Sequence, residues 1–288
     1  MTALESKVGT LVGEPVVRSE PVSGGDINAA FRLTLKSGRR LFAKTHRSPL
    51  AGVFSREADG LAWLGEPHAI RVPEIVAASE ADDLGPACLV LEYIQQGKPG
   101  PRYAEHLGRG LSALHRAGAA SFGWRKPNYL ATLPQDNTPT SDWPTFYAHY
   151  RLAPLLRRAE KRGYLDRALV ARMNRLFDRM SEFTGDPEPP ARLHGDLWGG
   201  NALAAASGEP VLIDPAVYGG HREIDLAMMK LFGGFSSRVF DAYAEASPLA
   251  SGHEDRVALY QLYPLLAHVC LFGAGYVAQL SAAMEPYS

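Results

Sequence analysis

The sequence has little cysteine, little net charge and no long uninterrupted apolar run, and each shortage excludes a class of protein. Only Cys88 and Cys270 occur among the 288 residues, and they form no C-x-x-C pair, so neither a disulfide scaffold nor a zinc site is expected. The 30 basic and 31 acidic residues leave a net charge of -1, which gives no electrostatic footprint for nucleic acid. We therefore expect a small-molecule or protein partner and a cytoplasmic location.

The most apolar stretch, residues 262–280, contains Pro264, His268 and Gln279. This composition favours a buried helix over a membrane span. The N-terminus MTALESKVGT lacks the basic start and apolar core of a signal peptide, so export is not expected. We therefore predict no membrane association, and no pattern in the sequence specifies an oligomeric state.

The first third of the chain has the periodicity of β-strands. Between residues 16 and 93, short runs rich in Val, Leu and Phe are bounded by Gly, Pro or Ser, as in EPVVRSEP, PEIVAASE and PACLVLEY. FRLTLKSGRRLFAKT, with Ser37 and Gly38 at its centre, predicts a β-hairpin. One helix interrupts the strands, since Phe54, Ala58 and Leu61 recur at helical spacing.

Helical periodicity dominates after the turn-rich segment 95–101, for example in AEHLGRGLSALHRAG and RALVARMNRLFDRMSEF. The sequence therefore predicts an α+β fold with two lobes. Residues 1–94 would form a β-rich nucleotide-binding lobe with one key helix. Residues 95–288 would form a larger, mainly helical lobe for catalysis and acceptor binding, with a cleft at residues 92–97.

The loop RLHGDLWGGN, residues 192–201, carries the strongest chemical signal. Phosphoryl transfer requires a group that orients the attacking hydroxyl and ligands for metal ions that neutralise the phosphates. In protein kinases, an Asp and an Asn five residues apart perform these tasks, and Asp196 and Asn201 have that spacing. The alternative is an ordinary turn, because short motifs of this kind recur by chance.

A second acid strengthens this interpretation. Asp214 follows the apolar run Val211, Leu212 and Ile213, 18 residues after Asp196. A metal-binding carboxylate is expected on such a strand, and magnesium prefers one or two carboxylates together with substrate phosphates. The sequence thus predicts Asp196 as the catalytic base and Asn201 and Asp214 as Mg²⁺ ligands.

The β-rich lobe of such a kinase needs a cation for the ATP phosphates and an acid that positions it. Lys44 ends the apolar strand RLFAK, and Glu57 lies on the following helix in the inward register of Phe54 and Leu61. Each residue alone would be interpreted as a solvated surface charge. Their order and context predict an ion pair that binds ATP.

Other nucleotide contacts are defined less sharply by the sequence. In SGGDIN, the residues Gly24, Gly25 and Asn28 could present backbone amides to phosphate, but the full G-x-G-x-x-G pattern is absent and a plain hairpin turn fits equally well. The adenine is expected to meet the backbone of Glu92, Tyr93 and Ile94.

The loop and its surroundings resemble the fructosamine kinase, or ketosamine-3-kinase, family. The resemblance rests on HGDLWGGN, on LIDPAVYGGHREIDLAMMKLFGGF and on the middle section SFGWRKPNYLATLPQDNTPTSDWPTFYAHYRL. It implies the protein-kinase-like fold shared with aminoglycoside phosphotransferases and choline kinases. It also implies ATP-dependent phosphorylation of a sugar hydroxyl, O3, on a fructosamine or ribulosamine, free or on a glycated protein, as deglycation repair.

The resemblance assigns roles to further residues. Trp198 would border the acceptor pocket, although a core tryptophan that braces the loop is an equal alternative. His194 would orient the loop by hydrogen bonding, and Asp225 would hold the loop's backbone. His115, at the end of a helix, is interpreted as a structural histidine.

Three rival interpretations remain. A related small-molecule kinase for an aminoglycoside, choline or a sugar would share all of the catalytic residues, and a non-catalytic nucleotide-binding module would not need all of them. A protein kinase is disfavoured because Pro215 and Ala216 replace the Phe-Gly that follows the metal-binding Asp, and because only 11 positions separate Asp214 from Asp225. Such a short segment leaves no room for a phosphorylated activation loop, so we expect constitutive activity.

Overall fold

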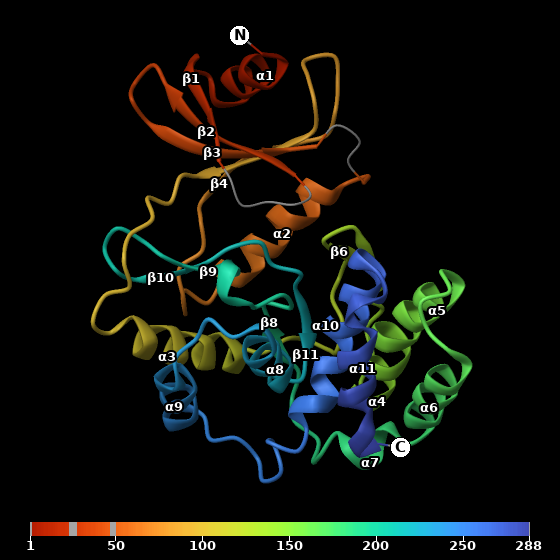
Figure 1. Cartoon of the computed structure of the whole chain (residues 1–288). Helices are drawn as coiled ribbons and strands as arrows, with labels where there is room; N and C mark the ends of the chain where they lie inside the picture. Colours follow the sequence, from red (N-terminus) through yellow and green to blue (C-terminus); the bar gives the residue numbers. More distant parts are fainter. Residues whose placement is uncertain (1, 23–27, 47–49, 288) are drawn as a thin grey trace. The chain divides into compact units, whose positions relative to one another are not determined.

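The computed structural model describes residues 2–22, 28–46 and 50–287 (Figure 1). The chain forms two compact units, Met1–Tyr103 with Leu203–Pro215, and Ala104–Ala202 with Ala216–Ser288. The sequence places the lobe boundary at 94/95, whereas the first unit continues to Tyr103 and takes in a later segment. Each unit is described by itself.

The first unit is built on a five-stranded antiparallel sheet with the order β1-β2-β3-β5-β4. Its strands are β1 (Val16–Pro21), β2 (Ala29–Leu35), β3 (Arg40–Thr45), β4 (Ile75–Ser79) and β5 (Cys88–Glu92). β2 and β3 form the predicted hairpin, with Leu33 opposite Leu41. Gly38 has φ +87° in its turn, a conformation that glycine adopts without strain.

Each face of this sheet packs against one helix. Helix α1 (Ala3–Val12) supplies Leu4 and Val8 to a core with Leu33, Leu41 and Val90. Helix α2 (Val53–Gly65), which the sequence predicts, packs on the other face. Its side of the core contains residues from α2 and β5, namely Phe54, Leu61, Leu89 and Leu91.

The sequence interpretation missed helix α1. Its start is marked by a capping box, in which the Glu5 amide donates to Thr2 Oγ1 at 3.2 Å and the Thr2 amide donates to Glu5 at 2.8 Å. The pattern Thr-x-x-Glu at residues 2–5 is a known signal for a helix start.

The turn-rich segment 95–101 is held by a hairpin from far along the chain. Strands β9 (Ala202–Ala204) and β10 (Pro210–Leu212) form this hairpin. The Gly97 amide donates to Ala204 O at 2.9 Å, and the Ala206 amide donates to Gln95 O at 2.7 Å. These backbone bonds explain why residues 203–215 belong to the first unit.

The second unit is mainly helical. Its helices are α3 (Tyr103–Arg116), α4 (Trp143–Phe146), the π-helix η1 (Tyr147–Leu152), α5 (Ala153–Lys161), α6 (Arg167–Asp178), α7 (Met180–Phe183), α8 (Glu223–Phe232), α9 (Ser237–Ala246), α10 (Val257–Phe272) and α11 (Val277–Met284). Two short antiparallel pairs join them, β6 (Asn128–Leu130) with β7 (Leu133–Gln135) and β8 (Ala191–Leu193) with β11 (Tyr218–Gly220). The candidate catalytic loop begins directly after β8 and ends where β9 begins.

The apolar stretch at residues 262–280 is divided between two helices. Helix α10 ends at Phe272, Gly273 follows with φ +89°, and α11 begins at Val277. Leu262, Leu265 and Leu266 are buried in the second unit. Among the described residues, no helix is both long and apolar enough to cross a membrane.

Candidate active site

Lys44 and Glu57 form the ion pair that the sequence predicts. On β3, Leu41 and Ala43 point toward α1, so Phe42 and Lys44 point toward α2, because successive strand residues alternate between faces. Lys44 Nζ donates to Glu57 Oε1 at 2.8 Å, and the two side chains are 8% and 14% exposed. The pair is therefore nearly shielded from water.

Asp214 contacts the same ammonium group from the end of strand β10. Lys44 Nζ donates to Asp214 Oδ1, so two carboxylates share one cation. Burial alone would lower the pKa of Lys44, but the charges of Glu57 and Asp214 outweigh burial and raise the pKa above its ordinary value. Lys44 consequently stays charged. Burial raises the pKa of Glu57, with a further contribution from Asp214 and an opposing one from Lys44.

Asp214 has an unusual backbone conformation. Its φ of +55° lies in the left-handed region, which a residue with a side chain adopts at a cost of about 1–3 kcal/mol. Its side chain is 41% exposed although its neighbours Val211 and Leu212 are fully buried. The strand end therefore presents a partly exposed carboxylate.

Three other residues that are predicted to bind the nucleotide use their side chains in contacts within the protein. The Glu92 carboxylate accepts from Arg71 and from the Glu74 amide. The Tyr93 ring lies under the guanidinium groups of Arg32 and Arg40, at 5.6 and 5.5 Å. Ile94 packs with Ala205 and Val211. Of the predicted glycine loop, Asn28 is partly buried, while Gly24 and Gly25 lie outside the described residues.

In the second unit, the loop after β8 holds Asp196 and Asn201 together. Asn201 Nδ2 donates to Asp196 O at 2.8 Å and to Asp196 Oδ2 at 3.2 Å. Gly195 has φ +82°, and a Cβ there would overlap the Ala216 carbonyl oxygen, so the position requires glycine. The local geometry thus fixes the acid and the amide side by side.

Asp225, on helix α8, holds the backbone of this loop. Its Oδ2 accepts from the His194 amide at 2.8 Å, and its Oδ1 accepts from the Gly195 amide at 2.9 Å. Burial alone would raise the pKa of Asp225, but the hydrogen bond from His115, the nearby histidines and the Gly195 amide outweigh it and lower the pKa. His194 is fully buried, and its Nδ1 accepts from the Asp196 amide at 3.3 Å.

Trp198 differs from a core tryptophan, because its side chain is among the exposed large hydrophobic groups at 44%. Its indole covers Gly200, where a Cβ would overlap the ring. The alternative that Trp198 braces the loop from the core is therefore wrong. The indole is instead partly exposed at the loop.

An aromatic group beside this loop escaped the sequence interpretation. The rings of Phe232 and Tyr276 lie 4.6 and 4.9 Å from the ring of His268. Gly233 and Gly234, which follow Phe232, lie against Gly199 of the loop. The four-residue spacing of His268, Phe272 and Tyr276 could have indicated this group, but the three residues lie in an otherwise apolar stretch of sequence.

An Asp-Asn pair on a glycine-rich loop and a buried Lys-Glu pair are residue pairs that kinase-like phosphotransferases use. The sequence profile of the fructosamine kinase family matches residues 2–287. The chain belongs to the fructosamine kinase family. This confirms the resemblance, the α+β kinase-like fold class and the expectation of a phosphotransferase.

Relatives and solved structures agree with this assignment. A probable ketoamine kinase of Synechocystis is 36% identical over 288 residues, covering 98% of this chain and 95% of that protein. The chloroplastic protein-ribulosamine 3-kinase of Arabidopsis thaliana is 38% identical over 269 residues, covering 92% and 81%. The crystal structure of a candidate fructosamine-3-kinase from Thermobifida fusca superposes with a TM-score of 0.91, is 42% identical, and covers 99% of this chain and 98% of that one.

Proposed function

We propose that this protein is an ATP-dependent kinase that phosphorylates the O3 hydroxyl of ketosamines, such as ribulosamines or fructosamines, in deglycation repair. The observation that carries the proposal is the loop in which Asn201 holds Asp196, within a chain that belongs to the fructosamine kinase family along nearly its whole length. The acceptor is a free ketosamine or a glycated protein, and the reaction takes place in the cytoplasm.

Asp196 is the residue that we assign to the acceptor hydroxyl. Its carboxylate orients the hydroxyl and accepts its proton as the oxygen attacks the γ-phosphorus, while ADP leaves. Asp225 and His194 keep the loop in place through the hydrogen bonds described above. Trp198, with the aromatic group of Phe232, His268 and Tyr276 next to the loop, provides the surface against which the sugar or its amine lies.

Lys44 is the residue that we assign to the ATP phosphates. An ammonium that stays charged while buried is suited to hold them, and Glu57 fixes its direction. The backbone of Glu92, Tyr93 and Ile94 is assigned to the adenine, and that of the loop with Gly24, Gly25 and Asn28 to the phosphates.

The donor groups of Asn201 and Asp214 fit Mg²⁺. Asn201 uses its Nδ2 on Asp196, which leaves its amide oxygen to act as a ligand, and Asp214 presents a carboxylate that is 41% exposed. Magnesium prefers such hard oxygen donors and is completed by substrate phosphates. When bound, the metal would neutralise charge on the transferred phosphoryl group.

An acceptor panel tests this proposal. Purified protein is given Mg-ATP with a ribulosamine, a fructosamine, an aminoglycoside and choline, and ADP release is measured without prior phosphorylation of the enzyme. We expect turnover of the ketosamines only, and constitutive activity because of the short segment between Asp214 and Asp225. Turnover of choline or an aminoglycoside, without any ketosamine, would replace the proposed acceptor, and no turnover of any acceptor would favour the non-catalytic module.

A further inference from the structure

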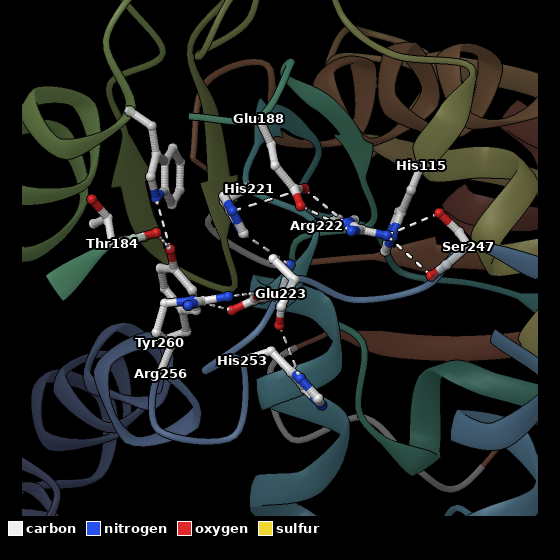
Figure 2. Close-up of polar contacts among 12 residues, drawn as sticks. His115, Thr184, Glu188, His221, Arg222, Glu223, Ser247, His253, Arg256 and Tyr260 are labelled. Atoms are coloured by element: carbon white, nitrogen blue, oxygen red, sulfur yellow. Dashed lines mark hydrogen bonds and ion pairs between the residues drawn. The ribbon is translucent and has the colours of Figure 1, made fainter. Parts of the chain in front are cut away.

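Helix α8 is anchored on several sides at its first turn, and one of these anchors leads to the candidate catalytic loop. Arg222, just before the helix, donates to Glu188 at 2.7 Å and to Ser247 Oγ at 2.9 Å (Figure 2). Glu223 accepts from Arg256 at 2.9 and 2.6 Å. These ion pairs fix where the helix begins. Asp225, two residues after Glu223, accepts the hydrogen bonds from the loop.

A buried chain of hydrogen bonds continues from Asp225 away from the loop. His115 Nε2, on α3, lies 3.1 Å from Asp225 Oδ2, and His115 Nδ1 lies 2.8 Å from the Tyr243 hydroxyl on α9. The three side chains are at most 3% exposed. His115 is more than 100 residues from both Asp225 and Tyr243 in the sequence, so the chain ties helix α3 to the consecutive helices α8 and α9.

The protonation pattern gives this chain a direction. Asp225 has a lowered pKa and is ionised, so it can only accept, and His115 Nε2 must donate to it. The other ring nitrogen of His115, Nδ1, is hydrogen-bonded to the Tyr243 hydroxyl. The hydroxyl of Tyr243 therefore holds the ring orientation of His115. Through Asp225 it acts on the His194 and Gly195 amides, which carry the loop.

We propose that Tyr243 and His115 are positioning residues for Asp196, acting through Asp225 on the backbone of the catalytic loop. Neither side chain touches the assigned reacting groups. The inference rests on the proposed function, because Asp196 is assigned there as the base. Mutation of the outer hydrogen-bond partners of a site typically lowers activity about ten- to hundredfold, and a misplacement of about 1 Å can cost about 100-fold.

A pair of matched tyrosine variants tests the proposal. Tyr243→Phe removes one buried hydroxyl, which is linked to the loop through His115 and Asp225. Tyr147→Phe removes a hydroxyl of the same unit that donates to Leu259 O at 2.7 Å and is also fully buried. Each variant loses one buried hydroxyl, and that of Tyr243 also hydrogen-bonds the Arg222 guanidinium. We expect kcat with a ribulosamine to fall about tenfold in Tyr243→Phe, with KM for ATP unchanged, and to stay within twofold of wild type in Tyr147→Phe.

Hydrogen exchange provides a readout that does not depend on activity. The His194 and Gly195 amides are expected to exchange about tenfold faster in Tyr243→Phe than in wild type or Tyr147→Phe, because their acceptor is less well held. His115→Phe, which removes both bonds, should give a larger effect on kcat and exchange. If the wild type turns over a ketosamine and both tyrosine variants share the same kcat and exchange rates, the positioning role is wrong. If the wild type turns over no ketosamine, the proposed function fails, and the exchange rates still decide the positioning role.

Discussion

Mutations in the Lys44–Glu57 pair should separate effects on stability from effects on ATP binding. Lys44→Met leaves Glu57 buried without its cation, and removing one partner of a buried pair costs about 3–5 kcal/mol. Protonation of Glu57 limits that cost. A pH of 7.5 lies about three units above the ordinary pKa of a glutamate, so protonating its carboxylate at this pH costs about 4 kcal/mol. We therefore expect a loss of about 3–4 kcal/mol in the free energy of unfolding at pH 7.5.

The same reasoning gives the sign of the pH dependence. A buried carboxyl without a cation has a pKa raised above its unfolded value, so the folded variant binds a proton that the unfolded chain has released. The destabilisation of Lys44→Met thus shrinks as pH falls toward the unfolded pKa, to about 1.5 kcal/mol at pH 5.5. Urea titrations at both pH values measure this, with Lys161→Met, an exposed lysine on α5, as the control.

A double variant completes the test. Lys44→Met with Glu57→Gln removes the stranded carboxyl, so stability should return to within about 1 kcal/mol of wild type at both pH values, since a buried ion pair can be replaced at little cost. ATP affinity, measured by calorimetry, should stay lost in the single and the double variant. Equal stability of Lys44→Met and wild type at both pH values would refute this reasoning, as would a double variant that binds ATP normally.

Three further predictions concern the metal ligand, the acceptor surface and a buried histidine. Asp214→Ala is expected to weaken ATP binding in the presence of Mg²⁺ about 100-fold, while Asp241→Ala, at an exposed position on α9, leaves it unchanged; equal affinities by calorimetry would remove Asp214 from the metal site. Trp198→Ala should raise KM for the ketosamine about tenfold without changing KM for ATP, with Trp198→Phe intermediate; a change in KM for ATP alone would contradict the acceptor role. Burial lowers the pKa of His221, despite Glu223 and Glu188 nearby. Below about pH 6.5 the unfolded chain therefore binds a proton that the folded chain does not, so the free energy of unfolding decreases as the pH is lowered. His221→Phe should reduce that fall in urea titrations between pH 7.5 and 5.5, and an unchanged slope would contradict the assignment.

The parts of the site that local periodicity specifies could be predicted from the sequence. Strand alternation and helical spacing were sufficient to place Lys44 opposite Glu57, and the five-residue spacing of Asp196 and Asn201 was sufficient to pair them. These predictions succeeded because each contact depends on residues that lie within one or two neighbouring elements. The family resemblance then supplied the reaction, and the family match confirms it.

Contacts between distant segments left no such pattern. The hairpin of β9 and β10 joins the first unit through backbone hydrogen bonds to residues 95–100, and backbone groups carry no sequence code. Likewise, His115 reads as an ordinary helix-end residue until Asp225 and Tyr243, 110 and 128 residues away, are seen beside it. The exposure of Trp198 excludes a core position for its ring, and local periodicity does not specify that exposure.

The central claim is that Asp196 serves an ATP-dependent phosphorylation of a ketosamine hydroxyl. ³¹P NMR of a ribulosamine incubated with Mg-ATP and the enzyme tests it directly, with Asp196→Asn as the comparison and ATP affinity measured in parallel. We expect a new phosphomonoester at O3 with wild type, a rate lower by a factor of about 10²–10⁴ with Asp196→Asn, and similar ATP affinity in both. Near-normal turnover by Asp196→Asn, or no phosphoester with wild type, would contradict the account.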